Sequence, residues 1–377
     1  MTPLPLYIHI PFCRRKCAYC DFCSFVPASG DMKKYFSLLK SELLLKLREL
    51  DPASISISSI YFGGGTPSLA DPGCFGDLLE FICKNFRLSP DAEISMEANP
   101  ESVHLKKLKG FRSAGINRIS LGIQSLDNKV LAYLGRLADR DANLKAAEAA
   151  CAAGFRNINY DLMFGLPLQD ARQVEKDILD LLPYGPTHFS LYSLILHRGT
   201  ALEKRIRREK PPMADERETY DAAAEWLERQ GFKTYELSNF AKPGFECRHN
   251  VAYWNYDAYA AIGISSVGRE GNIRYTNHAT LKKYAAALSA GKVPVKHKET
   301  LSGQTMKNEY VMMNFRKTEG ITRKDYSERF GQDFVEEFGK TMENMKAKGL
   351  IGWDKKKVYI RKKGRFISNS IIVEFFG

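Results

Sequence analysis

The sequence predicts an α/β fold, in which a partial (βα)6 barrel precedes a small helix-rich C-terminal domain of winged-helix character. Two observations predict this class. Up to about residue 196, six strand-like runs rich in β-branched and aromatic residues alternate with segments of helical periodicity. After about residue 300, helical patterns dominate and end in a short basic hairpin. Strands that alternate with helices indicate βαβ units and a parallel sheet.

The barrel elements follow one another in a regular order. Apolar residues at i, i+3, i+4 and i+7 spacing predict the helices between the strands. Six units rather than eight favour an open, partial barrel. The strands are expected at 6–12, 58–65, 92–100, 118–125, 157–167 and 187–196, and the helices at 32–50, 74–86, 140–155 and 173–185.

The pattern changes after about residue 210. An amphipathic helix is expected at 214–232, then a short strand at 233–241 and a Gly-, Ser- and aromatic-rich loop region at 248–269. Further helices are expected near 304–316, 322–329 and 332–348, before a hairpin or wing at 353–368. We therefore divide the chain into a core at 1–210, a connecting region at 211–300 and a C-terminal domain at 301–377.

Composition narrows the class of protein. The 377 residues carry a net charge of +12, partly from basic runs at 203–210 and 354–365. Such runs are usually solvated faces, so we expect no nucleic-acid partner; an anionic small molecule, such as a tetrapyrrole with propionates, fits the charge equally well. No apolar run approaches the ~20 residues of a membrane helix, and the N-terminus lacks a secretory signal. We expect a cytoplasmic protein without an integral membrane segment.

The cysteines point to a metal centre. Cys13, Cys17 and Cys20 form a C-x3-C-x2-C pattern, and thiolates favour zinc or iron–sulfur clusters. Zinc would need a fourth ligand, which Cys23 or His9 could supply. Three thiolates on a four-iron cubane would instead leave one iron open to a small molecule. The other four cysteines are expected to be buried small side chains: Cys74, Cys83, Cys151 and Cys247.

Unusual residues gather at the carboxyl ends of the expected strands, the face where barrels of parallel strands bind ligands. The cysteines follow the first strand, and GGGTP at 63–67 follows the second. Glycines permit close approach of backbone to a ligand. Glu97 and Gln124 end the third and fourth strands, and Asp161 lies in the fifth. Tyr19, inside the cysteine loop, would lie flat beside a cluster.

The cysteine pattern after the first strand of a βα array resembles the radical S-adenosylmethionine (SAM) superfamily. The string YIHIPFCRRKCAYCDF is similar to the branch that contains the oxygen-independent coproporphyrinogen III oxidases, and GGGTPS, MEANP, RISLGIQS, LGR and NYDLMFGLP follow in the same order. The resemblance runs from about residue 5 to 275. It implies a 4Fe-4S cluster on Cys13, Cys17 and Cys20, and a SAM site formed by Tyr7, Tyr19, Gly64, Gly65, Thr66, Glu97, Gln124, Arg136 and Asp161.

Within this branch, the chain resembles the heme chaperones called HemW. The resemblance rests on the short segment before Cys13, on the CDF string at 20–22, and on RHNVAYW at 248–254. It implies heme as a ligand, delivery of heme to apo-proteins, and a reductant protein as a partner. His249 would be an axial iron ligand, with Tyr253 and Trp254 against the porphyrin.

Alternative functions stay open at this stage. Cys23 and Val267 depart from the chaperone pattern, and the GISSVG string looks more like the oxidase. The main alternative is therefore an oxygen-independent coproporphyrinogen III oxidase, which decarboxylates porphyrinogen propionates oxidatively to protoporphyrinogen IX, or another radical SAM enzyme of tetrapyrroles. A structural zinc module is the third. The sequence assigns no catalytic residue, and whether the protein is an enzyme stays undecided.

Overall fold

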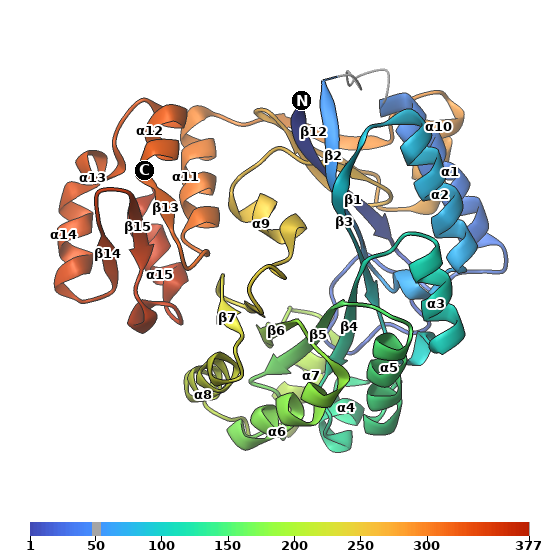
Figure 1. The fold of residues 1–377 in the computed structure, drawn as a ribbon, viewed down its shortest axis with the longest axis horizontal. Coiled ribbons are helices and arrows are strands. Elements are labelled where there is room, and N and C mark those ends of the chain that lie inside the picture. Colours follow the sequence, from blue (N-terminus) through green and yellow to red (C-terminus); the bar gives the residue numbers. More distant parts are fainter. Residues whose placement is uncertain (47–53, 377) are drawn as a thin grey trace.

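A curved sheet flanked by helices forms the larger part of the molecule, and a smaller C-terminal domain lies beside it (Figure 1). The computed structural model describes residues 1–46 and 54–376. The helix predicted at 32–50 is present as α1 (Asp31–Lys46), and its predicted last residues lie outside the described part.

Six parallel strands form the centre of a nine-stranded sheet of order β7-β8-β6-β5-β4-β3-β2-β1-β9. The prediction of an α/β fold with a parallel sheet is confirmed. Two short strands, β8 (Asn239–Ala241) and β7 (Lys233–Thr234), extend one edge in antiparallel pairing, and β9 (Ala260–Ile262) pairs parallel with β1 at the other. The central strands are β1 (Thr2–Ile10), β2 (Ile55–Gly64), β3 (Leu88–Ala98), β4 (Arg118–Gln124), β5 (Asn157–Phe164) and β6 (His188–Ser193).

Helices cover the outer side of this sheet (Figure 1). Aspartates at the N-caps of several helices, such as Asp71, Asp139 and Asp170, accept backbone N–H groups of the first turn and so fix where each helix begins. Three helices before residue 210 were not predicted: α3 (Leu105–Ser113), α4 (Asn128–Leu134) and α7 (Ala201–Glu209). The others are α2 (Pro72–Asn85), α5 (Arg140–Ala152), α6 (Ala171–Leu181) and α8 (Glu216–Arg229).

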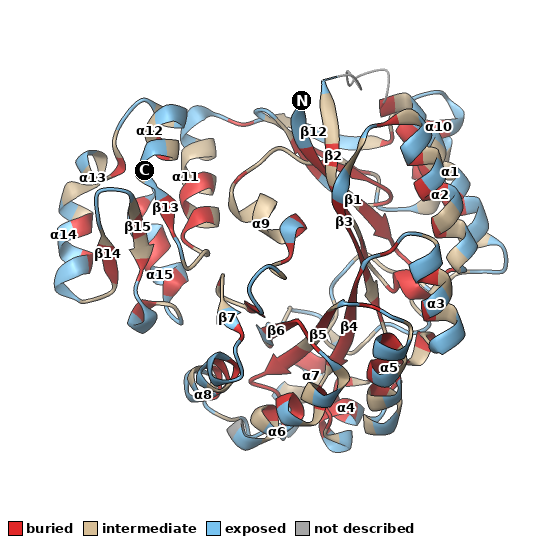
Figure 2. Cartoon of the chain, in the orientation of Figure 1, coloured by how far each residue is buried: buried red, intermediate tan, exposed pale blue. Residues whose placement is uncertain are grey.

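The two faces of the sheet differ in chemistry because alternate residues of a strand point to opposite faces. Apolar side chains such as Ile60, Phe62 and Ile119 belong to the main hydrophobic core, which includes the helices of the outer side. Polar side chains occupy the intervening positions and form the barrel interior. This second set contains Ser59, Tyr61, Glu93, Ser95, Glu97, Arg118, Ser120, Asn159, Asp161 and Ser190. Most of the length of the central strands is buried (Figure 2).

The scattered cysteines do not all behave as predicted. Cys247 is buried and Cys74 is partly buried, but Cys83 and Cys151 are exposed. The prediction of burial is wrong for these two because they lie on the outward surfaces of α2 and α5, away from the sheet.

The region 248–269, expected to be a loop, is largely structured, and the prediction is wrong there. Its RHNVAYW string forms helix α9 (Arg248–Trp254). The carboxylate of Glu93, on β3, accepts the backbone N–H groups of Arg248 at 3.2 Å and His249 at 3.4 Å. A buried carboxylate at a helix N-terminus stabilises the first turn, which composition alone does not reveal.

The rest of the connecting region makes a three-stranded antiparallel sheet and a helix. These elements are β10 (Val267–Glu270), β11 (Ile273–Asn277), α10 (Leu281–Ser289) and β12 (Val295–Thr300). Because β8 and β9 of this region join the two edges of the main sheet, the region packs as an extension of the barrel. The predicted domain boundaries at 210 and 300 stay predictions.

The C-terminal domain has a hydrophobic core of its own, which includes Tyr310, Phe334 and Phe375. The single helix predicted at 332–348 is divided at Phe338, whose φ of −108° and ψ of 20° interrupt the helical backbone while its ring packs on Phe334. A hairpin is present as β14 (Ile351–Trp353) and β15 (Lys357–Ile360), but it ends before the predicted residue 368, because a 3-10 turn and a further helix follow it. The remaining elements are α11 (Gly303–Asn314), β13 (Ile321–Thr322), α12 (Arg323–Phe330), α13 (Phe334–Glu337), α14 (Gly339–Ala347) and α15 (Ser368–Ile372).

Short 3-10 turns complete the chain at Pro67–Leu69, Pro100–Ser102, Leu182–Tyr184, Lys362–Gly364 and Val373–Phe375. In the described part of the chain, no helix combines the length and the apolar character that crossing a membrane requires.

Candidate cluster and cofactor site

The cysteine loop leaves β1 and is closed by backbone contacts at its base. The N–H of Cys13 donates to the carbonyl of Phe25 at 3.1 Å, and the N–H of Phe25 donates to the carbonyl of Pro11 at 2.8 Å. The rings of Phe12 and Phe25 meet edge to face at 5.2 Å below these bonds. The loop is therefore anchored at both ends to the end of the first strand.

The middle of the loop is anchored to the opposite wall of the barrel. Ala18 donates its N–H to the carbonyl of Leu134 at 3.1 Å and accepts the N–H of Leu202 at 2.9 Å. Arg15 Nη2 donates to the carbonyl of Gly135 at 2.8 Å. Ala18 and Tyr19 also pack on a small apolar cluster from α4, α7 and neighbouring loops. These contacts hold the cysteines over the carboxyl ends of the strands.

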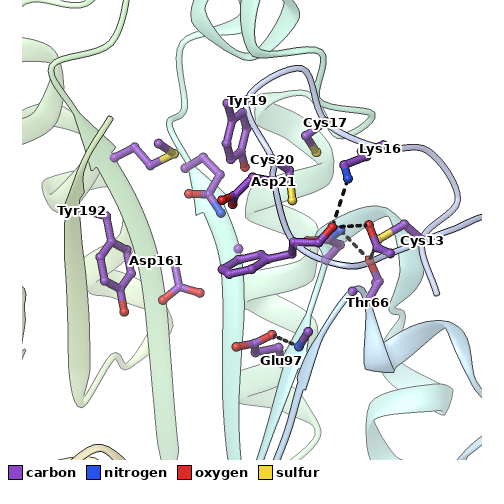
Figure 3. Close-up of a pocket in the computed structure, with 18 of the residues that line it drawn as sticks. Cys13, Lys16, Cys17, Tyr19, Cys20, Asp21, Thr66, Glu97, Asp161 and Tyr192 are labelled. Carbon is purple, nitrogen blue, oxygen red and sulfur yellow. Dashed lines mark hydrogen bonds between the residues drawn. The ribbon is translucent and has the colours of Figure 1, made fainter. Parts of the chain in front are cut away.

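A cavity of about 430 Å³ opens beneath the loop. Cys13, Cys17 and Cys20 line one end, and Glu97 and Asp161 lie deeper (Figure 3). Thr66 Oγ1 lies 3.5 Å from the sulfur of Cys13, and Arg136 Nη1 lies 3.5 Å from the sulfur of Cys17. Hydrogen bonds and cations near sulfur stabilise thiolates.

The three cysteines do not form a site for a single ion. Across residues 1–46 and 54–376, no three His, Cys, Asp or Glu side chains converge closely enough to hold one metal ion. A cluster places each thiolate on a different iron, so wider spacing suits it. Cys23 lies outside the cavity lining and its thiol is 3.5 Å from the carbonyl of Ala279.

The glycines of GGGTP permit close approach of other parts of the chain. Gly64 has φ of +112°, and a Cβ there would lie 2.3 Å from the ring of His9. A Cβ on Gly65 would lie 2.7 Å from the carbonyl oxygen of Phe12. Gly65 and Thr66 donate their N–H groups to the carbonyls of Ile10 at 2.8 Å and Phe12 at 2.7 Å. The motif therefore joins the end of β2 to the cysteine loop, and Gly64, Gly65 and Thr66 line the cavity.

Glu97 is held at the cavity wall by two donors. Tyr61 OH donates to Oε1 at 2.9 Å, and the N–H of Gly64 donates to Oε2 at 3.0 Å. Burial, followed by the nearby Asp161 carboxylate, raises the pKa of Glu97 to about 7. A cation bound in the cavity would favour the ionised form of Glu97, and the ionised carboxylate would in turn stabilise the bound cation.

The other predicted SAM residues share this cavity. Asp161 accepts from Ser120 Oγ at 3.0 Å and from Asn159 Nδ2 at 2.7 Å, and burial raises its pKa. Arg136 Nη2 donates to the carbonyl of Gly122 at 2.6 Å, while Nε is buried without a partner among the described residues. Gln124, at φ of +67°, and Tyr19 also line the cavity.

Two predicted residues do not line the cavity. Tyr7 lies in the barrel interior, where its hydroxyl contacts His9 Nδ1 at 3.0 Å and its ring stacks on Tyr61. His249 is 1% exposed. Its Nδ1 lies 2.9 Å from Ser59 Oγ and its Nε2 lies 2.9 Å from Tyr253 OH, so neither nitrogen is free to bind iron. In this structure α9, the helix that contains His249, covers part of the barrel interior and places the buried His249 ring there.

Several residues of the site were not predicted from the sequence. Tyr61, Ser120 and Tyr192 line the cavity beside the predicted set. Each lies two residues from another inward-facing polar residue on its strand, as in SIYFG, RIS and HFSLY. This period-two polar pattern was the available signal, because it marks one face of each strand as a polar interior.

Known proteins resemble the chain over these same parts. The family model described as the Radical SAM superfamily matches residues 7–181, and the HemN C-terminal domain model matches 301–367. A solved structure of coproporphyrinogen III oxidase (HemN) from Escherichia coli superposes with a TM-score of 0.85 at 21% identity, covering 100% of this chain and 90% of that one. The fold and the cysteine site thus define a radical SAM protein.

Relatives at higher identity cover the whole chain. The heme chaperone HemW of Bacillus subtilis is 32% identical, over 98% of this chain and 98% of its own length. HemW of Mycobacterium tuberculosis is also 32% identical, over 100% of this chain and 95% of its own. The chain belongs to the HemW family.

The superfamily implies a 4Fe-4S cluster and SAM, and the cavity fits both. Three thiol-bearing side chains share one end of it, and two carboxylates with raised pKa values lie at the other, where a cationic sulfonium compound would be stabilised. Arg136, with an unpartnered buried Nε, lies between the two.

Proposed function

We propose that the protein is a heme chaperone, which binds heme and delivers it to apo-protein acceptors. The observation that carries this proposal is the full-length match, at 32% identity, to relatives named heme chaperones. The likeness to the E. coli oxidase, at 21% identity, supports the fold alone.

The cavity supports the proposal because it is lined by both polar and apolar side chains. The inner cavity is polar and carries Glu97 and Asp161, whereas its outer part includes apolar side chains such as Leu194 and Ile195. A porphyrin is apolar in its macrocycle and anionic at its propionates. The opening combines these apolar side chains with the basic Arg15 and Lys16, which also line the cavity. Such a combination suits a ligand of this kind.

We also propose which residues hold the resident cofactors. Cys13, Cys17 and Cys20 would bind three irons of the cluster, and Gly64, Gly65, Thr66, Glu97, Gln124, Arg136 and Asp161 would surround SAM. When bound, the cluster and SAM supply one-electron chemistry at an open iron. The chain orients the two groups: Arg136 contacts Cys17 and also bonds the β4 carbonyl of Gly122, so it links the cluster end to the SAM end.

Heme transfer tests the chaperone function directly. The protein, reconstituted anaerobically and loaded with one heme, is mixed with an apo-globin, and transfer is followed by the visible spectrum of the acceptor. Faster transfer from the loaded protein than from heme bound to serum albumin supports the proposal. Stable retention of heme, or transfer no faster than from albumin, would contradict it.

A reductant protein and natural heme acceptors are further partners that the proposal requires. Pull-down of the heme-loaded protein, compared with the heme-free form, tests for acceptors that depend on the cargo. A chaperone predicts partners that bind the loaded form preferentially.

A further inference from the structure

The mouth of the cavity is lined by apolar side chains that remain exposed. Phe22, in the cysteine loop, is 64% exposed, and Ile195, in the loop after β6, is 67% exposed. Both line the cavity, together with Leu194 and the partly exposed Tyr192. Large apolar side chains exposed around an opening mark a binding surface. The two loops that supply them come together where His197 contacts Asp21.

One histidine stands among these apolar residues. The chain has seven histidines, and His197 alone belongs to the described residues that line the cavity. Its Nδ1 lies 3.1 Å from Oδ2 of Asp21. No partner for its Nε2 is found in the part of the chain that the structure describes. The Asp21 carboxylate thus lies beside one ring nitrogen, and the other nitrogen is available at the mouth.

A carboxylate beside one ring nitrogen is common next to metal-binding histidines. A ligating imidazole usually donates its second N–H to a carboxylate, which fixes the tautomer and raises the basicity of the ligating nitrogen. Here Asp21 follows directly after Cys20, so the orienting carboxylate belongs to the cysteine loop itself.

The other histidines lack this combination. Three are buried with both ring nitrogens in contact with partners: His9 with Tyr7 and Cys23, His188 with Asn159 and Tyr235, and His249 with Ser59 and Tyr253. The remaining three lie away from the cavity lining: His104 caps α3, His278 follows β11, and His297 is in β12.

Basic residues complete the surface. Arg15 and Lys16, on the outer side of the cysteine loop, also line the cavity and are exposed. Lys16 Nζ donates to the carbonyl of Phe22 at 3.0 Å, and no carboxylate of the described residues forms an ion pair with it. Exposed cations beside apolar side chains suit the propionates of a bound porphyrin.

We propose that heme binds at this mouth, between the cysteine loop and the loop after β6, with its iron ligated by Nε2 of His197 and with Asp21 as the orienting carboxylate. Phe22 and Ile195 would contact the macrocycle, and Arg15 and Lys16 the propionates. The inference rests on the proposed heme function and names the site and the ligand. It places the cargo beside the loop whose cysteines would hold the cluster.

The test is an anaerobic titration of the reconstituted protein with ferric heme, followed by absorbance and electron paramagnetic resonance. His197→Gly should remove the imidazole-ligated spectrum and weaken binding by about tenfold or more. Added imidazole should restore the wild-type spectrum in this variant, which a merely structural role would not produce. Asp21→Asn should keep the ligand but weaken binding less. Iron and sulfide content verifies that the cluster is intact in each variant.

His104→Ala is the control, because His104 lies outside the cavity lining, and it should bind heme as the wild type does. If the wild type binds no heme, the proposed function itself fails. If the wild type binds heme and His197→Gly shows the same spectrum and affinity, the chaperone proposal stands and the assignment of His197 is overturned. His249→Ala then tests the ligand suggested by the sequence.

Discussion

Glu97 shows how the barrel interior prepares one side chain for a cation. Tyr61 and Gly64 hold its carboxylate in place, while burial and Asp161 raise its pKa to about 7. The ionised form is therefore only partly populated near neutral pH, and a cationic ligand would bind together with the loss of a proton.

SAM binding should therefore depend on pH. Ionised Glu97 favours the positive sulfonium compound, so affinity should rise with pH through about 7 and then level off. At pH 6 the affinity should be about tenfold below its plateau, since one pH unit below the pKa leaves about a tenth of the group ionised. Equilibrium dialysis of SAM at pH 6 and pH 8 measures this.

Glu97→Gln cannot ionise and serves as the control. It should bind SAM more weakly at pH 8, with a much flatter pH dependence. An equally steep rise in the variant would assign the titration to another group, of which Asp161 is the nearest candidate.

Glu236 predicts a pH dependence of folding stability. Burial raises its pKa to about 7 from 4.5, and its Oε1 has no partner among the described residues. The raised pKa means that its stabilising effect is complete below about pH 4.5 and is lost as pH rises through about 7. Glu236→Gln should therefore gain stability relative to the wild type between pH 5 and pH 8, by about 2–3 kcal/mol.

Urea unfolding of both proteins at the two pH values gives this difference directly. The comparison with wild type removes the opposite contribution of His249, whose pKa burial lowers to about 3. A constant difference between the two proteins across this pH range would show that the pKa of Glu236 is not raised in the folded state.

For single residues, the sequence predicted those whose spacing indicates a chemical role. Cys13, Cys17 and Cys20 were recognisable because three thiols in one short loop have few structural uses. The heme role of His249 stays a prediction, but its burial was not recognisable from its sequence context. Its two partners, Ser59 and Tyr253, come from β2 and α9 and meet only in the folded chain.

At the scale of elements, the turn after β2 depends on Gly65. A Cβ there would meet the backbone of Phe12 and Ile10 at 2.7–2.9 Å, and backbone cannot move aside as a flexible side chain can. Gly65→Ala should push the cysteine loop away from β2, destabilise the fold by about 1–3 kcal/mol and lower the iron content after reconstitution.

Gly303→Ala is the matched control, because nothing lies within 4 Å of the Cβ that it would add. Thermal unfolding and iron analysis of both variants decide the case. Equal stability and equal iron content would show that the turn tolerates a side chain and that the close approach is not needed.

Elements with strong local signals were predictable and the others were not. The six long strands and α1 follow from β-branched runs and apolar periodicity. Helix α9 was missed because its first turn is stabilised by Glu93, which is 155 residues from Arg248 along the chain. The seven-residue α4 is too short for a clear periodic pattern.

At the scale of the whole molecule, Glu42 joins the barrel to the connecting region. This fully buried side chain on α1 accepts from Gly263 N at 2.8 Å, from Asn277 Nδ2 at 2.7 Å and from Tyr284 OH. Each donor comes from a different segment of the connecting region: the turn after β9, the end of β11, and α10.

Glu42→Ala should therefore be strongly destabilising, because it leaves buried donors without an acceptor. The expected loss is about 3 kcal/mol or more. Ser41→Ala, at an exposed position of the same helix, should change the free energy of unfolding by less than about 0.5 kcal/mol. Chemical denaturation measures both, and similar values would contradict the account.

The global architecture was predictable only in outline. Alternating strand and helix patterns gave the parallel sheet and its curved, open form. The pairing of β9 with β1 and of β8 with β6 depends on residues far apart along the chain, in strands of three residues that have no sequence signature. The connecting region therefore looked separate in the sequence, although it packs as part of the barrel.

The measurement that most directly tests the central claim is a heme titration and a coproporphyrinogen III turnover assay on one sample, reconstituted anaerobically and supplied with SAM and a reductant. The account predicts one heme bound per chain and no protoporphyrinogen. Formation of protoporphyrinogen IX without stoichiometric binding of heme would contradict it and identify the protein as an oxidase.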